Sequence, residues 1–182
     1  YAATFGNIYR TINGGTSWSN VKGNLPTSTA AITHIAVSSS NPDMVWVSLS
    51  GFNAENKVFY SSTGGTTWTN VSTGLPNVPV NCIEYQKGSN DILYVGTDLG
   101  VYYKDASLGS WTPYSIGLPN IIINELEVYS PTSKLRAATF GRGIWEIDLV
   151  SPILQNVDAS ASSVISPAQS ICDSVITPVV KI

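Results

Sequence analysis

The chain has 182 residues, a formal net charge of −3 and only 12% charged residues. It carries no basic stripe that would neutralise nucleic-acid phosphates and no apolar stretch long enough to span a bilayer. We therefore expect neither a nucleic-acid partner nor a membrane span. Two cysteines, Cys82 and Cys172, are too few for a disulfide framework or a metal site. They lie in different segments and are not expected to pair, and we expect no metal or cofactor.

Along the chain the sequence predicts short strands joined by turns, and helical periodicity is absent almost everywhere. Four segments repeat the same pattern, with starts spaced by roughly 44, 48 and 42 residues, which is the period of four-stranded propeller blades. They are Tyr1–Gly6, Val45–Ser50, Leu93–Asp98 and Leu135–Gly141. The first and last are nearly identical, since both contain the run Ala-Ala-Thr-Phe-Gly.

Each repeat is predicted to hold four strands, of which these segments are the second. The first strands are Ile32–Val37, Val80–Tyr85 and Ile123–Val128; the third are Ile8–Arg10, Val58–Ser61, Val101–Tyr103 and Ile144–Ile147; the fourth contain Trp18, Trp68 and Trp111. Residues 1–149 therefore predict an all-β fold, a partial β-propeller of about three and a third blades. Because one blade cannot bury both of its faces, the remaining blades of the same propeller are expected as partners.

Two turns between third and fourth strands carry a shared motif. Thr11–Trp18 and Ser61–Trp68 resemble the Asp-box (BNR repeat) of sortilin-like, sialidase-like and xyloglucanase-like propellers. Asn and Thr replace the box aspartate, and a third copy, Lys104–Trp111, keeps only its Gly and Trp. We expect these residues to be structural: Asn13, Gly15, Trp18, Thr63, Gly65, Trp68, Gly109 and Trp111. Gly permits the chain reversal, a short polar side chain bonds amides in the turn, and Trp packs on the blade.

The blade pattern stops after Leu149. Residues 150–157 read as a linker around Pro152. Residues 158–182 resemble the first two strands of an immunoglobulin-type, CARDB-like adhesion module, which implies a truncated β-sandwich. In that family an early cysteine often pairs with a later one, and Cys172 occupies such a place.

The resemblance implies that ligands bind at the face opposite the boxes. The candidate ligand-binding residues on that face are Phe5, Asn7, Phe52, Asp98, Phe140 and Arg142. Asp98 is also the one weak catalytic candidate, either as an acid or base or as a cap of its own turn. Arg142 either grips a carboxylate or forms a structural pair. Glu84 and Glu127 occupy equivalent first-strand positions, and so do His34, Cys82 and Glu125; they form either a carboxylate pair or an inter-blade polar network.

Two functions remain open at this point. The degenerate boxes and the adhesion-like tail favour a non-catalytic propeller that binds a polysaccharide or a protein, within a large secreted or cell-surface bacterial protein. The alternative is a glycoside hydrolase of the xyloglucanase or sialidase-like type. The aromatic turns would stack on sugars, but no convincing pair of carboxylates is seen, and two carboxylates are what glycoside hydrolysis requires.

Overall fold

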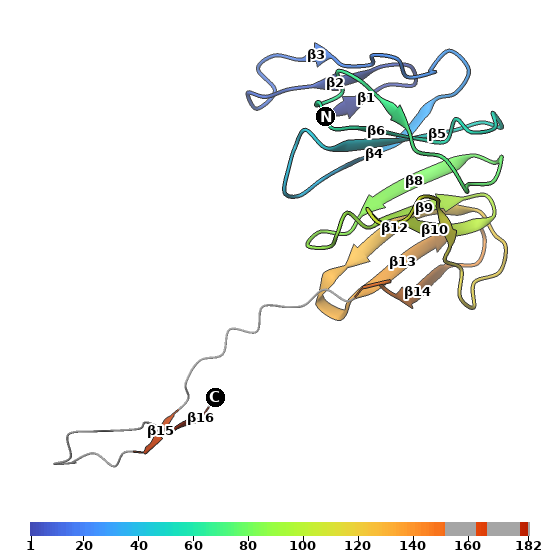
Figure 1. Cartoon of the computed structure of the whole chain (residues 1–182). Coiled ribbons are helices and arrows are strands. Elements are labelled where there is room, and N and C mark those ends of the chain that lie inside the picture. Colours follow the sequence, from blue (N-terminus) through green and yellow to red (C-terminus); the bar gives the residue numbers. More distant parts are fainter. Residues whose placement is uncertain (152–162, 167–178, 182) are drawn as a thin grey trace.

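The computed structural model describes residues 1–151, 163–166 and 179–181. Within these ranges the chain is all-β apart from a single 3-10 turn, Ser130–Thr132. Fourteen of the strands form four antiparallel sheets that stack one upon another (Figure 1). The predicted partial β-propeller is confirmed, and each sheet is one blade.

Each blade is a meander of consecutive strands. Blade 1 contains β1 (Ala2–Ala3), β2 (Ile8–Arg10) and β3 (Ser19–Asn20). Blade 2 contains β4 (Ile32–Val37), β5 (Val45–Leu49), β6 (Val58–Ser61) and β7 (Thr69–Asn70). Blade 3 contains β8 (Val80–Tyr85), β9 (Leu93–Thr97), β10 (Gly100–Lys104) and β11 (Thr112–Pro113). Blade 4 contains β12 (Ile123–Tyr129), β13 (Lys134–Thr139) and β14 (Ile144–Asp148).

The fourth strands differ from the prediction in one respect. Each is two residues long and starts directly after its tryptophan rather than containing it. The reason is that the tryptophan backbone amide bonds to the preceding blade instead of to its own sheet. Trp68 N donates to Asn24 Oδ1 at 3.0 Å, and Trp111 N donates to Thr73 O at 2.8 Å.

Three apolar clusters fill the spaces between successive blades. Between blades 1 and 2 the cluster includes Ile8, Val47 and Leu49. The next cluster, between blades 2 and 3, includes Trp46 and Ile83. The third joins blade 3 to blade 4. Strands such as β5 and β9 are buried along their whole length because both faces of their sheets are covered, which explains their continuous apolar sequence.

Each first strand contains an irregularity at the same place. The register shifts between Ile32 and His34, between Val80 and Cys82, and between Ile123 and Glu125. The residues skipped by the pairing are Thr33, Asn81 and Asn124. Such bulges redirect a side chain out of the regular ladder. Here they turn equivalent polar residues toward the neighbouring blade: Thr33 Oγ1 donates to Val80 O at 2.7 Å, and Asn81 Nδ2 donates to Ile123 O at 3.1 Å.

The outer faces of the stack differ in chemistry. On blade 1, β1 and Trp18 are exposed. On blade 4, the outer face carries Arg136 between Glu127 and Glu146, which it contacts at 3.7 and 3.0 Å. The face of blade 4 is therefore ion-paired where the corresponding faces of blades 2 and 3 are largely apolar and aromatic.

Beyond the blades, the chain segment next to Leu149 stays attached to blade 3. Val150 N donates to Tyr94 Oη at 2.9 Å, and Gln86 Nε2 donates to Ser151 O at 2.6 Å. Farther on, β15 (Ser163–Ser166) and β16 (Val179–Lys181) pair antiparallel. Most of the predicted linker, and Cys172, lie outside the described residues.

The described ranges contain no helix with the length and hydropathy needed to cross a membrane.

Candidate functional site

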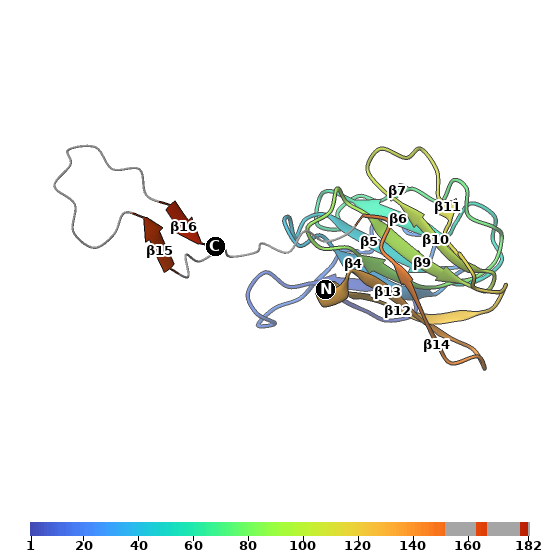
Figure 2. The same cartoon turned by 90° about the horizontal axis from the view of Figure 1, so that it is seen from below.

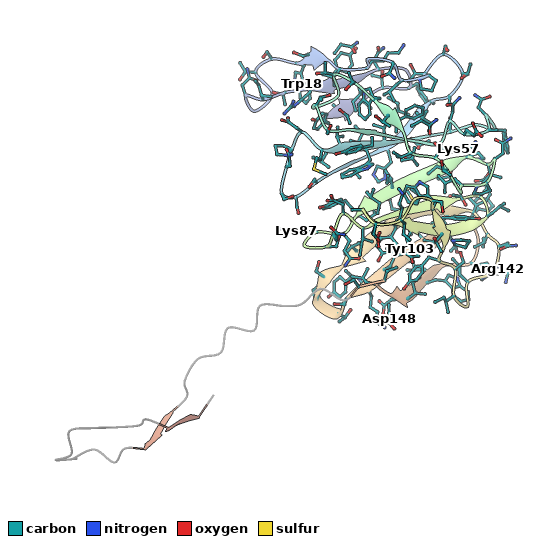
Figure 3. All side chains as sticks on the ribbon, viewed as in Figure 1. Trp18, Lys57, Lys87, Tyr103, Arg142 and Asp148 are labelled. Carbon is teal, nitrogen blue, oxygen red and sulfur yellow. The ribbon has the colours of Figure 1, made fainter. Side chains whose placement is uncertain are left out.

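The turns between second and third strands project from one end of the blades, and the turns with the Asp-box-like sequence project from the other. Figure 3 shows this separation, with Lys57 and Arg142 toward one end of the strands and Trp18 and Lys87 toward the other (Figure 3). The view turned by 90° shows the same strands from below (Figure 2). We call the end with the second-to-third-strand turns the aromatic-turn face.

Exposed apolar side chains recur on the aromatic-turn face, one in the second-to-third-strand turn of each blade. Phe5 is 83% exposed, Phe52 and Phe140 are each 68% exposed, and Leu99 is 42% exposed. All four lie in the turn between the second and third strand of their blade. Ile116, 74% exposed, follows β11 at the same end. Neither Leu99 nor Ile116 is among the candidate residues chosen from sequence, although the alignment of repeats places Leu99 beside the other turn residues.

These turns are held by backbone hydrogen bonds, so their apolar tips have a defined place. Ile32 N donates to Phe5 O at 3.1 Å, and Phe140 N donates to Ile122 O at 2.9 Å. The longest turn, residues 51–56, is supported from inside by the buried Lys57, whose Nζ donates to Gly51 O at 2.7 Å. A rigid backbone beneath exposed apolar groups lowers the entropy that binding must offset.

A shallow depression of about 540 Å³ lies on this face, across blades 1 to 3. Phe5 borders it on blade 1, Ser50 on blade 2, and the bulge residues Thr33 and Asn81 line its floor. Asn81 Nδ2 also donates to Asp98 Oδ1 at 3.0 Å. Asp98 is thus fixed by an amide next to the depression.

The other candidates do not gather at this depression. Phe52, Phe140 and Arg142 lie on their own turns and do not line it. Within the described ranges Arg142 forms no ion pair; its carbonyl oxygen accepts from Trp145 Nε1 at 3.2 Å. Asn7 Oδ1 accepts from Asn20 Nδ2 at 3.1 Å within blade 1. The candidates therefore form a row along the turns rather than one enclosed pocket.

At the opposite end, the box residues bond within their own turns. Asn13 Oδ1 accepts from Ser17 N at 3.0 Å, and Thr63 Oγ1 accepts from Thr67 N at 3.1 Å. Gly15 and Gly65 adopt φ of +93° and +91°, which favours glycine. In the third copy, Asp105 Oδ1 accepts from Ser107 N and Leu108 N at 2.7 and 3.0 Å, while Gly109 has no positive φ.

The inner-strand polar residues lie between blades. His34 Nδ1 accepts from Ile83 N of the next blade at 3.1 Å. Burial raises the pKa of Glu84, the neighbouring Glu125 and Glu127 raise it further, and a hydrogen bond with the Val128 backbone opposes them. Cys82 is a buried free thiol whose pKa burial raises to about 12. In the described part of the chain, no group of three or more His, Cys, Asp or Glu residues is arranged to hold a metal ion.

The pKa of Glu84 leads to a prediction about pH. Between the ordinary carboxyl pKa and the raised one, the folded state binds more protons, so the free energy of unfolding falls as pH rises through that range. Glu84→Gln is therefore expected to raise the thermal midpoint at pH 7, by about 2–4 °C for each kcal/mol gained. The gain should vanish below about pH 4. Thermal melts at both pH values measure it, with the exposed Glu55→Gln as control; an equal gain at both would contradict the expectation.

No family model and no curated protein sequence matches the chain. Two solved structures are similar to it in fold. The structure of YCF48 bound to D1 peptide aligns with a TM-score of 0.55 at 16% identity, over 80% of this chain and 46% of that one. The GH74 enzyme of Niastella koreensis aligns with a TM-score of 0.48 at 18% identity, over 78% and 24%. The chain spans less than half of either protein, and the first likeness supports the β-propeller fold alone.

Proposed function

We propose that this chain is part of a non-catalytic β-propeller that binds a polysaccharide or protein ligand through its aromatic-turn face. The observation that carries the proposal is the recurrence of an exposed apolar side chain on the equivalent turn of all four blades: Phe5, Phe52, Leu99 and Phe140. Exposed apolar groups clustered on one face are typical of interaction sites, and aromatic side chains supply much of the binding energy at interfaces.

The polar groups of this face support binding rather than hydrolysis. Asp98 is held by Asn81, which lines the depression. Glycoside hydrolysis requires a second carboxylate at a defined separation across the bond to be cleaved. In the described turns between second and third strands, the other acidic side chain is Glu55, which lies in the separate turn of residues 51–56.

The class of ligand follows from the same surface. Flat aromatic groups stack on sugar rings and also anchor peptide side chains, so polysaccharide and protein ligands share the chemistry that this row offers. YCF48, whose fold is similar, is bound to D1 peptide, so a propeller of this kind accommodates a protein ligand. We further propose that the parent protein is secreted or on the cell surface, and that β15 and β16 begin an immunoglobulin-type module. The support for that module is their antiparallel pairing.

The test compares the 182-residue chain with a triple variant, Phe5→Ser, Phe52→Ser, Phe140→Ser. Both are assayed against a panel of soluble polysaccharides by affinity electrophoresis and against a displayed peptide library by selection. At least one class of ligand should bind the unchanged chain about tenfold or more tightly than the variant, because three anchors are lost. No reducing sugar should appear.

Two outcomes would contradict the proposal. If the unchanged chain and the triple variant bind both panels with equal affinity, the aromatic row does not bind the ligand. Release of reducing sugar that Asp98→Asn abolishes would instead establish glycoside hydrolysis. The matched control is Ile12→Ser, which removes another exposed apolar side chain but at the box end of blade 1.

A further inference from the structure

A second concave site lies at the opposite end of the blades, where blade 2 meets blade 3. It is a pocket of about 210 Å³, lined among others by Trp46, Tyr60, Trp111, Asp91, Lys104 and Asp105. This volume equals that of roughly seven water molecules, which suits one long side chain rather than an extended ligand. The pocket combines aromatic walls with two carboxylates and one ammonium, so its charged groups sum to one negative charge.

The junction between blades 1 and 2 shows what the same position holds one repeat earlier. The strand registers make Tyr1 equivalent to Trp46 and Arg10 equivalent to Tyr60. Asp43 and Asp91 are equivalent as well, since each lies two residues before its second strand. At that first junction the Arg10 guanidinium pairs with Asp43 and lies 5.6 Å from the centre of the Tyr1 ring. The protein's own cation thus fills an aromatic and acidic site.

At the second junction the aromatic wall and the acid remain, but the cation is replaced by Tyr60. Trp46 stacks on Tyr60 with ring centres 5.0 Å apart and on Tyr85 at 5.6 Å. Asp91 Oδ1 accepts from Tyr85 Oη at 2.8 Å, and within the described ranges no ion pair neutralises Asp91. The third junction has Ser133 in place of the acid. The combination of aromatic rings with an unpaired carboxylate therefore occurs at one of the three junctions.

The turn between the third and fourth strands, which covers this position, also differs between blades 2 and 3. In blade 2 the Gly-Gly turn closes over Arg10, and Gly64 N donates to Asp43 O at 2.9 Å. In blade 3, Ser107 and Leu108 stand at the positions of the two glycines, and Ala106 N donates to Asn90 O at 3.3 Å. Both of these residues lie one position earlier in the repeat than Gly64 and Asp43. Lys104 Nζ donates to Leu108 O in its own turn. Hydrogen bonds from Ser107 lower the pKa of Asp105, so this carboxylate is charged at neutral pH.

We infer that this pocket binds the guanidinium of an arginine side chain from a peptide or protein partner. Tyr60 holds the sequence position of Arg10, so the incoming cation would enter the pocket beside Tyr60 and face Asp91 and the aromatic walls. A guanidinium stacks on aromatic faces and bonds carboxylates at the same time, which is the pair of contacts offered here. The site is independent of the proposed ligand at the aromatic-turn face, because it lies at the other end of the strands.

The test uses the 182-residue chain and a blocked glycyl-arginyl-glycine tripeptide, with the uncharged citrulline tripeptide as the matched probe. Indole N–H signals in ¹H–¹⁵N NMR report the site, because Trp46 and Trp111 line the pocket and Trp18 does not. We expect the arginine peptide to shift the Trp46 signal with a Kd on the order of 1 mM, typical of one side chain. The citrulline peptide should bind at least tenfold more weakly.

Three variants separate this site from general attraction by the acidic chain. Asp91→Asn keeps an acceptor for Tyr85 but removes the charge, and should weaken binding about tenfold. Asp43→Asn makes the same change where Arg10 already occupies the site, and should leave binding unchanged. Tyr60→Arg places a cation in the pocket from within and should abolish binding. Equal binding of the two peptides, no shift of the Trp46 signal, or equal weakening by Asp43→Asn and Asp91→Asn would overturn the inference.

Discussion

Trp111→Ala is expected to lower the free energy of unfolding by about 3–5 kcal/mol, the usual cost of removing a large buried aromatic side chain. Trp111 is 3% exposed, and its indole Nε1 donates to Val71 O at the end of the preceding blade at 2.7 Å. The substitution therefore leaves a cavity between two blades and removes the hydrogen bond that the partly buried Val71 carbonyl oxygen accepts. Urea unfolding, followed by intrinsic fluorescence and by circular dichroism, measures the loss.

The matched comparison is Trp18→Ala, which changes the equivalent tryptophan of blade 1. Trp18 is 47% exposed, and in the described part of the chain its indole forms no hydrogen bond. We expect a loss of about 1 kcal/mol or less, as for most exposed sites. If both substitutions cost the same, the stabilising contact of the motif would lie within its own turn rather than between blades.

Gly96→Ala is expected to destabilise the chain by about 1–3 kcal/mol through overpacking. A Cβ at this position would lie 2.6 Å from Cys82 Sγ and 2.6 Å from Ile123 Cγ2, both of which are buried between blades 3 and 4. These atoms belong to packed strands and cannot move aside without shifting a blade. The equivalent positions of the other blades hold Ala3, Ser48 and Ala138, so a small side chain is common to this point of every repeat.

The control for Gly96 is Gly109→Ala. A Cβ at Gly109 would meet no atom within 4 Å, and the residue does not have a positive φ. Its effect should stay within about 0.5 kcal/mol. Cys82→Ala combined with Gly96→Ala should recover part of the loss, because one of the two clashing atoms is removed. If the double variant recovers nothing, the whole cost arises from the contact with Ile123. Thermal midpoints of the unchanged chain, Gly96→Ala, Gly109→Ala and the double variant distinguish these outcomes.

The repeat period and the alternation of strands and turns were readable from sequence, because blade geometry constrains local residues. The predicted bounds are correct for four strands, β2, β4, β6 and β8. In each of them, β-branched and aromatic residues favour a strand and the flanking residues favour a turn, so both signals mark the same limits. The fourth strands were placed less well. Nothing local to Trp68 or Trp111 indicates that their backbone amides bond to the preceding blade.

The candidate site was predicted unevenly for a related reason. Phe5, Phe52 and Phe140 share a repeat position, so the repeat alone placed them on one face. Their relation to the depression lined by Thr33 and Asn81 depends on strand bulges and on the spacing of blades. The pocket at Trp46 was missed, because its walls come from two blades. It also depends on the replacement of Arg10 of blade 1 by Tyr60 at the equivalent position of blade 2.

The sequence by itself determined the all-β class, the blade period and the positions of the turns, since each rests on residues close together in the chain. Tertiary structure alone decided which of the equivalent residues are buried, paired or open to a ligand. Trp18 and Trp111 have the same local sequence role but different exposure, because only Trp111 has a blade packed against it in this chain. Packing between blades, and not the repeat, makes one copy of a motif a structural contact and leaves another free.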